Sequence, residues 1–343
     1  MTMPFDAVPA GAYPLVAPPA GAAAAAPPVE PTFSVLVPAY QCAGLIGSTL
    51  ESILAQTLPA HEVIVCDDGS TDGTADVAES FGAAVTVLRN EHAGSGAARN
   101  ACLSRATGTH IVGIDADDLV LPGLLAAYAD ALRVRPDLQI VTCDAYLETN
   151  GVIFDRYYRR TARFHVADQR LEALHQHFIF SFAAVLRTAA VEIGGWDRQL
   201  RSGMDTDFFL RLILAGAAAG LVWEPLAVYR MRSGSLSSDR ARSMRAMVRI
   251  VERALEHESL SADERAAAAA DLEIKRRLTA IAELDRALAG NGDVRQRSLA
   301  VARASSGRRK ALAYATAAFP RTARLAHRAT GRGSSSLISR TRS

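Results

Sequence analysis

The sequence predicts an α/β protein: a doubly wound, mostly parallel sheet with helices on both faces, plus a C-terminal helical extension. Between about residues 33 and 143, short apolar runs alternate with stretches of helical periodicity. Such alternation is typical of βαβ units and a parallel sheet. Acidic clusters directly follow two of the apolar runs, and ligands bind outside the carboxyl ends of strands in such sheets. After about residue 240 the chain is rich in Ala and Arg, which indicates helix.

The elements follow in chain order from Phe33. The apolar run at 33–37 predicts a first strand, which Pro38 ends. Apolar residues at helical spacing between Leu45 and Leu54 predict a helix that stops before Pro59. By the same reasoning we expect strands at 63–66, 85–88, 110–114 and 138–143, and helices at about 74–81, 95–106, 121–134 and 205–216.

Later segments carry turn and cap signals. Asn150-Gly151 predicts the turn of a hairpin between Tyr146 and Tyr158. Ser261 with Glu264 predicts a capping box, and Gly290 is the expected end of that helix. The predicted organisation is an Ala/Pro-rich disordered leader, a main α/β domain, a helical extension and a disordered basic tail, at 1–31, 32–238, 239–330 and 331–343.

Charge is distributed unevenly along the chain. The net charge is +2, but residues 301–343 contain ten Lys and Arg and no Asp or Glu. The first basic residue is Arg89, so the N-terminal region lacks the positive segment of a secretory signal. No apolar run reaches the length of about 20 residues that spans a bilayer. We therefore expect a cytoplasmic protein without a nucleic-acid partner. Two interpretations of the basic segment 301–343 stay open: peripheral contact with the anionic inner face of the membrane, or a solvated Arg-rich face.

The first acidic cluster is Asp67-Asp68, followed by Gly-Ser-Thr-Asp-Gly at 69–73. Turn chemistry explains the glycines, and Asp72 or Thr71 suits a helix cap. It does not explain two adjacent acids directly after a buried strand. A carboxylate at this position can accept a hydrogen bond from a base N–H or a ribose hydroxyl.

The second acidic cluster, Asp115-Ala116-Asp117-Asp118, carries the strongest signal. Carboxylates at the ends of neighbouring strands repel one another. Three acids after an apolar strand fit a divalent metal ion that bridges diphosphate oxygens. A surface loop is the plain alternative. A phosphatase of the Asp-x-Asp-x-Thr type is disfavoured because Leu119 occupies the hydroxyl position.

Two further segments suggest a nucleotide ligand. Val-Pro-Ala-Tyr at 37–40 ends the first strand, and Tyr40 is suited to stack on a base. The glycines at 94–96 open a helix but lack the third glycine of a dinucleotide fingerprint, so we exclude that cofactor site. Arg99 lies between the two acidic clusters in sequence and can pair with them or with a diphosphate.

Taken together, these residues resemble family 2 glycosyltransferases of the GT-A fold. The resemblance runs from about Phe33 to Ser238. The motifs that carry it are Val-Pro-Ala-Tyr at 37–40, Asp-Asp-Gly-Ser-Thr-Asp at 67–72, Ala-Arg-Asn at 98–100, Asp-Ala-Asp-Asp at 115–118, Gly-Gly-Trp-Asp at 194–197, and Asp205.

The resemblance implies transfer of a sugar from a nucleotide diphosphate donor, commonly UDP-linked, with inversion. It implies a saccharide or lipid-linked acceptor, and Mg²⁺ or Mn²⁺ as cofactor. Asp205 matches the catalytic base, and Asp115 and Asp117 match the Asp-x-Asp pair, with Asp117 the direct metal ligand. The residues that the resemblance assigns to the nucleotide pocket are Pro38, Ala39, Tyr40, Asp67, Asp68, Arg99 and Asp115.

Two positions depart from the family pattern. Met204 replaces the acid that usually precedes the base, and Arg232 lies where relatives often have a metal-assisting histidine. Arg232 is expected to contact the diphosphate directly and to reduce the dependence on metal. The processive Gln-x-x-Arg-Trp motif is absent, so we expect single-sugar transfer in surface polysaccharide or glycolipid synthesis. Two alternatives stay open: a non-catalytic nucleotide-sugar-binding or membrane-recruitment protein with a degenerate site, and a nucleotidyltransferase.

Overall fold

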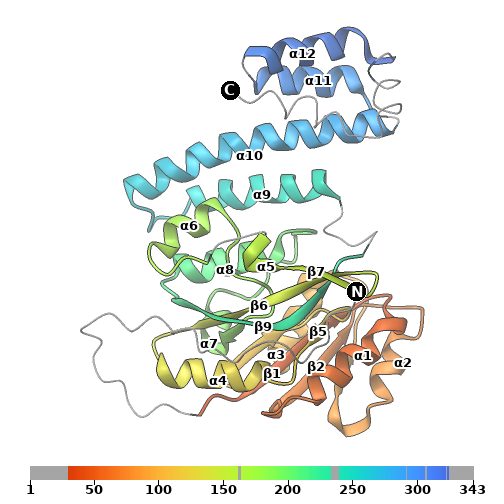
Figure 1. The fold of residues 1–343 in the computed structure, drawn as a ribbon, viewed down its shortest axis with the longest axis vertical. Coiled ribbons are helices and arrows are strands. Elements are labelled where there is room, and N and C mark those ends of the chain that lie inside the picture. The colour runs from red at the N-terminus through yellow and green to blue at the C-terminus, as the bar shows by residue number, and fades with distance from the viewer. Residues whose placement is uncertain are drawn as a thin grey trace. The chain divides into compact units, whose positions relative to one another are not determined.

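The computed structural model describes residues 30–160, 164–232, 239–290, 292–305, 307–321 and 323 (Figure 1). The expected leader, apart from residues 30 and 31, and the expected tail at 331–343 lie outside the described residues. The chain forms two compact units that divide between Ser233 and Gly234, called unit 1 and unit 2 below.

One nine-stranded sheet organises the described part of unit 1. Its order is β3-β2-β1-β4-β8-β6-β9-β5, with β7 paired to β6. The strands are β1 (Phe33–Ala39), β2 (Glu62–Asp67), β3 (Thr86–Arg89), β4 (His110–Gly113), β5 (Leu119–Val120), β6 (Ile140–Thr149), β7 (Val152–Arg156), β8 (Ala184–Leu186) and β9 (Ala219–Arg230).

The first four strands form the expected parallel sheet. β1 pairs in parallel with β2 and β4, and β2 pairs in parallel with β3. Beyond β4 the sheet is mixed, because β8 runs antiparallel to both β4 and β6 while β6 and β9 are parallel. The predicted hairpin is confirmed: β6 and β7 are antiparallel, and Asn150 and Gly151 turn with positive φ of 53° and 79°.

Helices cover both faces of this sheet. In Figure 1, α5 and α8 lie above β6 and β9 and α4 lies below them. The helices of unit 1 are α1 (Ala43–Leu54), α2 (Thr74–Glu79), the 3₁₀ turn η1 (Gly82–Ala84), α3 (Ser95–Arg105), α4 (Leu124–Val134), α5 (Tyr157–Arg160), α6 (Gln169–His175), α7 (Arg187–Glu192) and α8 (Met204–Leu214). Every residue of β1 is buried. The strand does not end at Pro38 as expected, because Pro38 and Ala39 still pair in register with Cys66 and Asp67 of β2.

Unit 2 is helical where it is described. Its helices are α9 (Arg240–Leu255), α10 (Ala262–Ala289), α11 (Val294–Arg303) and α12 (Gly307–Ala318). The predicted capping box is confirmed at Ser261 and Glu264, and Gly290 caps the other end of α10. Leu284, Val301 and Ala313 are fully buried in a core that α10, α11 and α12 share. No helix in the described residues combines the length and the apolar character needed to cross a membrane.

The sequence interpretation missed elements that depend on distant partners. The strand expected at 138–143 continues to Thr149 because β9 pairs along its length. The helix expected from 121 begins at Leu124, since Leu119 and Val120 pair with β9 as the short strand β5. β8 is three residues long and carries no periodicity of its own.

Candidate active site

The sheet topology brings both acidic clusters to one edge. β1 lies between β2 and β4, and all three run in the same direction. Ala39 pairs in register with Asp67, and the Ile114 amide donates to the carbonyl of Leu36 at 2.9 Å. Neighbouring strands lie about 4.8 Å apart, so β2 and β4 are separated by roughly 10 Å.

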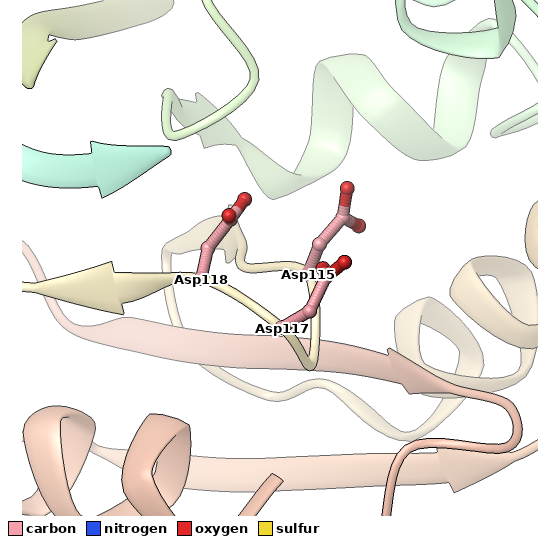
Figure 2. A group of neighbouring side chains, drawn as sticks. All are labelled: Asp115, Asp117 and Asp118. Atoms are coloured by element: carbon pink, nitrogen blue, oxygen red, sulfur yellow. The ribbon is translucent and has the colours of Figure 1, made fainter. Parts of the chain in front are cut away.

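Three carboxylates gather in the loop between β4 and β5. Figure 2 shows Asp115, Asp117 and Asp118 projecting from this loop toward the same side. Each offers an oxygen within 4.8 Å of the others. The loop is held from α1, because the Thr49 hydroxyl lies 2.9 Å from the carbonyl oxygen of Ala116 and 2.8 Å from that of Asp118.

Burial raises the pKa of two of these acids, Asp115 and Asp118. Removal of water raises the pKa of Asp115 to about 6; nearby Asp205 and Asp117 act in the same direction, and Arg99 opposes them. Burial raises the pKa of Asp118 well above its usual range, and Asp115 and Asp117 add to that effect. A cation placed among the three oxygens would favour their charged forms.

Each of the three carboxylates has a basic or amide partner from another element. Arg99 of α3 donates to Asp115 at 2.5 Å. The backbone amide of Arg230, at the end of β9, donates to Asp118 at 2.9 Å. Arg232 forms an ion pair with Asp117. The loop therefore lies between α3 on one side and the end of β9 on the other.

The donor set fits a hard divalent cation. Three carboxylate oxygens within reach of one another are the ligand type that Mg²⁺ and Mn²⁺ prefer. Two of these carboxyls have raised pKa values, and a divalent ion would relieve the repulsion that contributes to the rise. Asp115, Asp117 and Asp118 thus form the acidic group at which a metal would bind, and Asp115 and Asp117 are its more accessible members.

Arg99 connects the acidic loop to α8. Its side chain is only 6% exposed. The guanidinium contacts the hydroxyl of Ser95 one turn earlier in α3, and it lies 3.8 Å from Asp205 in addition to its bond with Asp115. A buried arginine is costly unless it is paired. Its two carboxylate partners meet that requirement and place Asp115 and Asp205 in one cluster.

Asp205 lies in the first turn of α8 with its carboxylate held on two sides. The indole Nε1 of Trp196 donates to it at 3.3 Å, and the Ser181 hydroxyl donates to the other oxygen at 3.4 Å. Trp196 stacks on Phe208 with ring centroids 4.0 Å apart. The stacked Trp196 and Phe208 rings therefore help to orient the Asp205 carboxylate. The Asp205 side chain remains 26% exposed.

The turn before Asp205 is fastened to α3. Asn100 exchanges two hydrogen bonds with the Trp196 backbone, at 2.7 and 2.8 Å. A Cβ on Gly195 would come within 2.3 Å of Asn100 Oδ1, and Gly195 has φ of +69°. A Cβ on Gly96 would lie 2.9 Å from the carbonyl oxygen of Asp197. The Ala-Arg-Asn motif at 98–100 and the Gly-Gly-Trp-Asp motif at 194–197 therefore contact each other.

The residues predicted for a nucleotide pocket differ in their exposure. Pro38 and Ala39 are buried within β1. Tyr40 directly after them is 48% exposed and stacks on His92, with ring centroids 4.3 Å apart. Of these three residues, only Tyr40 offers an accessible aromatic surface to a base.

Asp67 and Asp68 are both 3% exposed but serve different contacts. Asp68 accepts from the amides of Ala93 and Gly94 at 2.8 and 2.9 Å, so it clamps the loop before α3. Asp67 accepts from the Ser70 amide at 3.1 Å, and its other oxygen has no hydrogen-bond partner among the described residues. Asp67 thus retains capacity to accept a further donor.

Sequence reasoning missed several contacts of this site. His92, Ser181 and Arg230 follow no motif that it used. It also assigned no role to Asn100 or Trp196, although both lie in motifs that carry the family resemblance. Asn100 lies directly after Arg99, but its partner Trp196 lies 96 positions away in sequence, and Ser181 lies 24 positions before Asp205.

Comparison with known sequences identifies related proteins. The family model described as "Glycosyl transferase family 2" matches residues 34–194. EpsE of Bacillus subtilis (strain 168), named as a glycosyltransferase, is 30% identical over 214 residues, which cover 60% of this chain and 74% of EpsE. TuaG of the same organism, named for teichuronic acid biosynthesis, is 27% identical over 218 residues, or 62% of this chain and 83% of TuaG.

Solved structures show the same fold. Residues 1–349 of S. aureus TarS, in complex with UDP-GlcNAc, match with a TM-score of 0.60 and 18% identity over 87% of this chain and 92% of that one. The mannosyltransferase PcManGT from Pyrobaculum calidifontis, in complex with GDP-Man and Mn²⁺, matches with a TM-score of 0.58 and 22% identity over 89% and 83%. The chain spans 52% of a longer TarS structure. The predicted GT-A-type fold is confirmed.

Proposed function

This chain belongs to glycosyltransferase family 2, and we propose that it transfers a single sugar from a UDP-linked donor to an acceptor hydroxyl with inversion. The observation that carries the proposal is the placement of Arg99, which bonds Asp115 at 2.5 Å and lies 3.8 Å from Asp205. The buried Arg99 guanidinium thereby joins two parts of the site: the acidic loop, which is suited to bind a diphosphate, and the Asp205 carboxylate, which is suited to act as a base.

The donor nucleotide is proposed to bind at the ends of β1 and β2. Tyr40 supplies an exposed ring for the base, and base–aromatic stacking contributes about 1–3 kcal/mol. The unpartnered oxygen of Asp67 is suited to a base N–H or a ribose hydroxyl. Pro38 and Ala39 are buried within β1, and the amides of Ala93 and Gly94 occupy both oxygens of Asp68, so these three residues would shape and support the pocket from behind.

Asp205 is proposed to take the proton from the acceptor hydroxyl. Its carboxylate is held by Trp196 and Ser181 and is partly exposed, so an acceptor can reach it. A positioned general base contributes about 10²–10⁴-fold to the rate. One base and one displacement step invert the anomeric centre.

The acidic loop is proposed to hold Mg²⁺ or Mn²⁺ through Asp117 and Asp115. When bound, the ion stabilises negative charge on the departing diphosphate. Asp118 lies deeper and accepts from the Arg230 amide, so its share is to shape the loop. The complex of PcManGT with GDP-Man and Mn²⁺ supports the choice of metal and of a nucleotide-sugar donor.

The proposed acceptor is a saccharide or a lipid-linked saccharide of a surface polysaccharide or glycolipid. TuaG is named for teichuronic acid biosynthesis. Chondroitin synthase of Escherichia coli is 27% identical over 190 residues, or 54% of this chain and 27% of the synthase. Both names support a polymer-building pathway. The complex of TarS with UDP-GlcNAc supports a UDP-linked donor.

A thermal-shift screen tests the donor and the metal together. A ligand that binds only the folded protein raises the apparent melting temperature. We expect UDP-sugars with Mn²⁺ to raise it more than UDP-sugars with EDTA, and we expect UDP release when an acceptor is present. No shift and no UDP release with any nucleotide sugar would favour the non-catalytic alternative, whereas formation of a nucleotide sugar from sugar phosphate would indicate a nucleotidyltransferase.

The basic C-terminal segment is proposed to contact an anionic membrane surface. Tyr314 and Phe319 are 48% and 68% exposed on and just after α12. Lys310 and Arg321 are exposed beside them, and residues 301–343 contain no acid. Exposed aromatic rings among basic side chains suit the interface of anionic lipids.

A further inference from the structure

Arg232 covers the carboxylate that the proposed metal requires. Its guanidinium pairs with Asp117, which is the direct ligand in the proposed metal site. The Asp117 side chain is 24% exposed and the Arg232 side chain is 44% exposed. The pair therefore lies at the open side of the acidic loop, where a ligand can reach it.

The other partners of the acidic loop are held in place. Arg99 is 6% exposed and bound by Ser95, Asp115 and Asp205, so its departure would bury unpaired charge. Arg230 donates its backbone amide to Asp118, and its side chain contacts the Asp117 carbonyl oxygen and Ser48. Within the described residues, Arg232 is the partner that can leave without breaking the fold.

A divalent ion and a guanidinium cannot share the same face of Asp117. The guanidinium already lies against Asp117 Oδ2, and like charges at contact distance repel. A bound nucleotide diphosphate would bring new oxygens to the same place. Planar guanidinium groups bind such oxygens in two-point contacts.

We propose that Arg232 is an exchangeable internal counter-ion: it occupies Asp117 when no metal is bound, and the diphosphate takes it over when metal binds. The inference deepens the proposed function and rests on it. In this scheme Arg232 binds and positions the diphosphate. The metal ion and the Arg232 guanidinium compete for Asp117, and both bind the diphosphate when it is present.

The competition predicts effects of opposite sign in one variant. In Arg232→Gln, Mn²⁺ has no internal competitor, so its dissociation constant without nucleotide should fall about threefold to thirtyfold. The same variant loses a diphosphate partner in the metal-bound state, so its dissociation constant for UDP in saturating Mn²⁺ should rise by a similar factor. A merely structural role for Arg232 would weaken both ligands.

The measurements are electron paramagnetic resonance of free Mn²⁺ without nucleotide and calorimetry of UDP in saturating Mn²⁺, both on the full chain. Arg295→Gln is the matched control, because it removes the same charge from an exposed position of α11. It should change neither constant by more than about twofold, the scatter allowed for an exposed charge.

The outcomes separate the inference from the function on which it rests. Tighter Mn²⁺ together with weaker UDP in Arg232→Gln supports the exchange. Unchanged or weaker Mn²⁺ binding, or unchanged UDP binding, overturns it while the proposed transferase stands. If neither the wild-type protein nor Arg232→Gln binds Mn²⁺, the metal site in the proposed function fails and the exchange fails with it.

Discussion

Two aspartates at the start of α8 differ in their surroundings: one is the proposed base and the other holds the helix in place. Asp205 and Asp207 lie two positions apart at the start of α8. Asp205 is partly exposed beside Arg99, whereas Asp207 is buried and pairs with Arg211 at 2.8 Å. Arg211 in turn donates to the carbonyl oxygens of Ile193 and Gly195. The same side-chain type thus has two environments within one helical turn.

Asp205→Asn should reduce turnover by at least 10²-fold, the lower bound for loss of a general base. UDP affinity should stay near the wild-type value, because no proposed nucleotide contact is removed, and Arg99 keeps its 2.5 Å bond with Asp115. Asp207→Asn is the matched comparison, since it breaks the contact with Arg211 and should lower the melting temperature. Full turnover in Asp205→Asn would exclude Asp205 as the base.

Gly195→Ala should destabilise unit 1 through the turn before Asp205. The new Cβ would meet Asn100 Oδ1 at 2.3 Å, and a residue with a Cβ at φ of +69° carries a backbone cost of about 1–2 kcal/mol. Gly44→Ala, in α1 with nothing within 4 Å of the new Cβ, should be neutral or stabilising by up to about 1 kcal/mol. Urea unfolding measures both, and equal midpoints for the two variants would contradict the role assigned to this turn.

At the scale of elements, β4 combines a core position with a titratable group. His110 lies in register with Phe33 of β1 and with Leu186 of β8. Burial lowers its pKa to about 4 from the usual 6.5. The folded chain therefore keeps His110 neutral at a pH where the unfolded chain would protonate it.

This difference makes stability fall as the pH drops from about 6.5 toward about 4. Above pH 6.5 His110 is neutral in both the folded and the unfolded chain, so the full stability is present there. Below pH 6.5 the unfolded chain gains a proton at His110, and unfolding is favoured. Each pH unit in this window is worth about 1.4 kcal/mol. Between pH 6.5 and pH 5, urea unfolding should show wild type losing about 2 kcal/mol more than His110→Gln. Parallel losses in both proteins would show that His110 does not cause the dependence.

At the scale of the whole molecule, the chain combines a catalytic unit with a helical unit that ends in a basic segment. Ser233 and Gly234 mark the division. In unit 2 the buried positions Ala313 and Ala317 of α12 face its own core, which leaves Tyr314 and Phe319 exposed. The proposed association with a membrane should therefore depend on these exposed rings and on the basic charge of the segment.

The variant Tyr314→Ser/Phe319→Ser should sediment less with vesicles that contain anionic lipid at low salt. Binding of the wild type should fall as salt rises, because screening shortens the reach of surface charges to about 8 Å at physiological ionic strength. The control Ile274→Ser/Leu278→Ser removes exposed apolar side chains from α10 and should sediment like wild type. Equal sedimentation of all three proteins would remove α12 from any membrane role.

The parallel half of the sheet was predictable from the amino-acid sequence, and so was the choice of the acidic residues that form the candidate site. Local signals were sufficient there, because apolar runs, helical spacing and acids directly after strands are each read within about ten residues. The capping box at Ser261 and the turn at Asn150-Gly151 were predictable for the same reason.

Which of these residues meet depends on the packing of the folded chain. Arg99 lies between Asp115 and Asp205, and Arg232 pairs with Asp117 across 115 positions of sequence. The mixed half of the sheet likewise depends on β9 finding β5 and β6. Such contacts arise over long separations, and a pattern read along one segment carries no information about the distant partner that completes it.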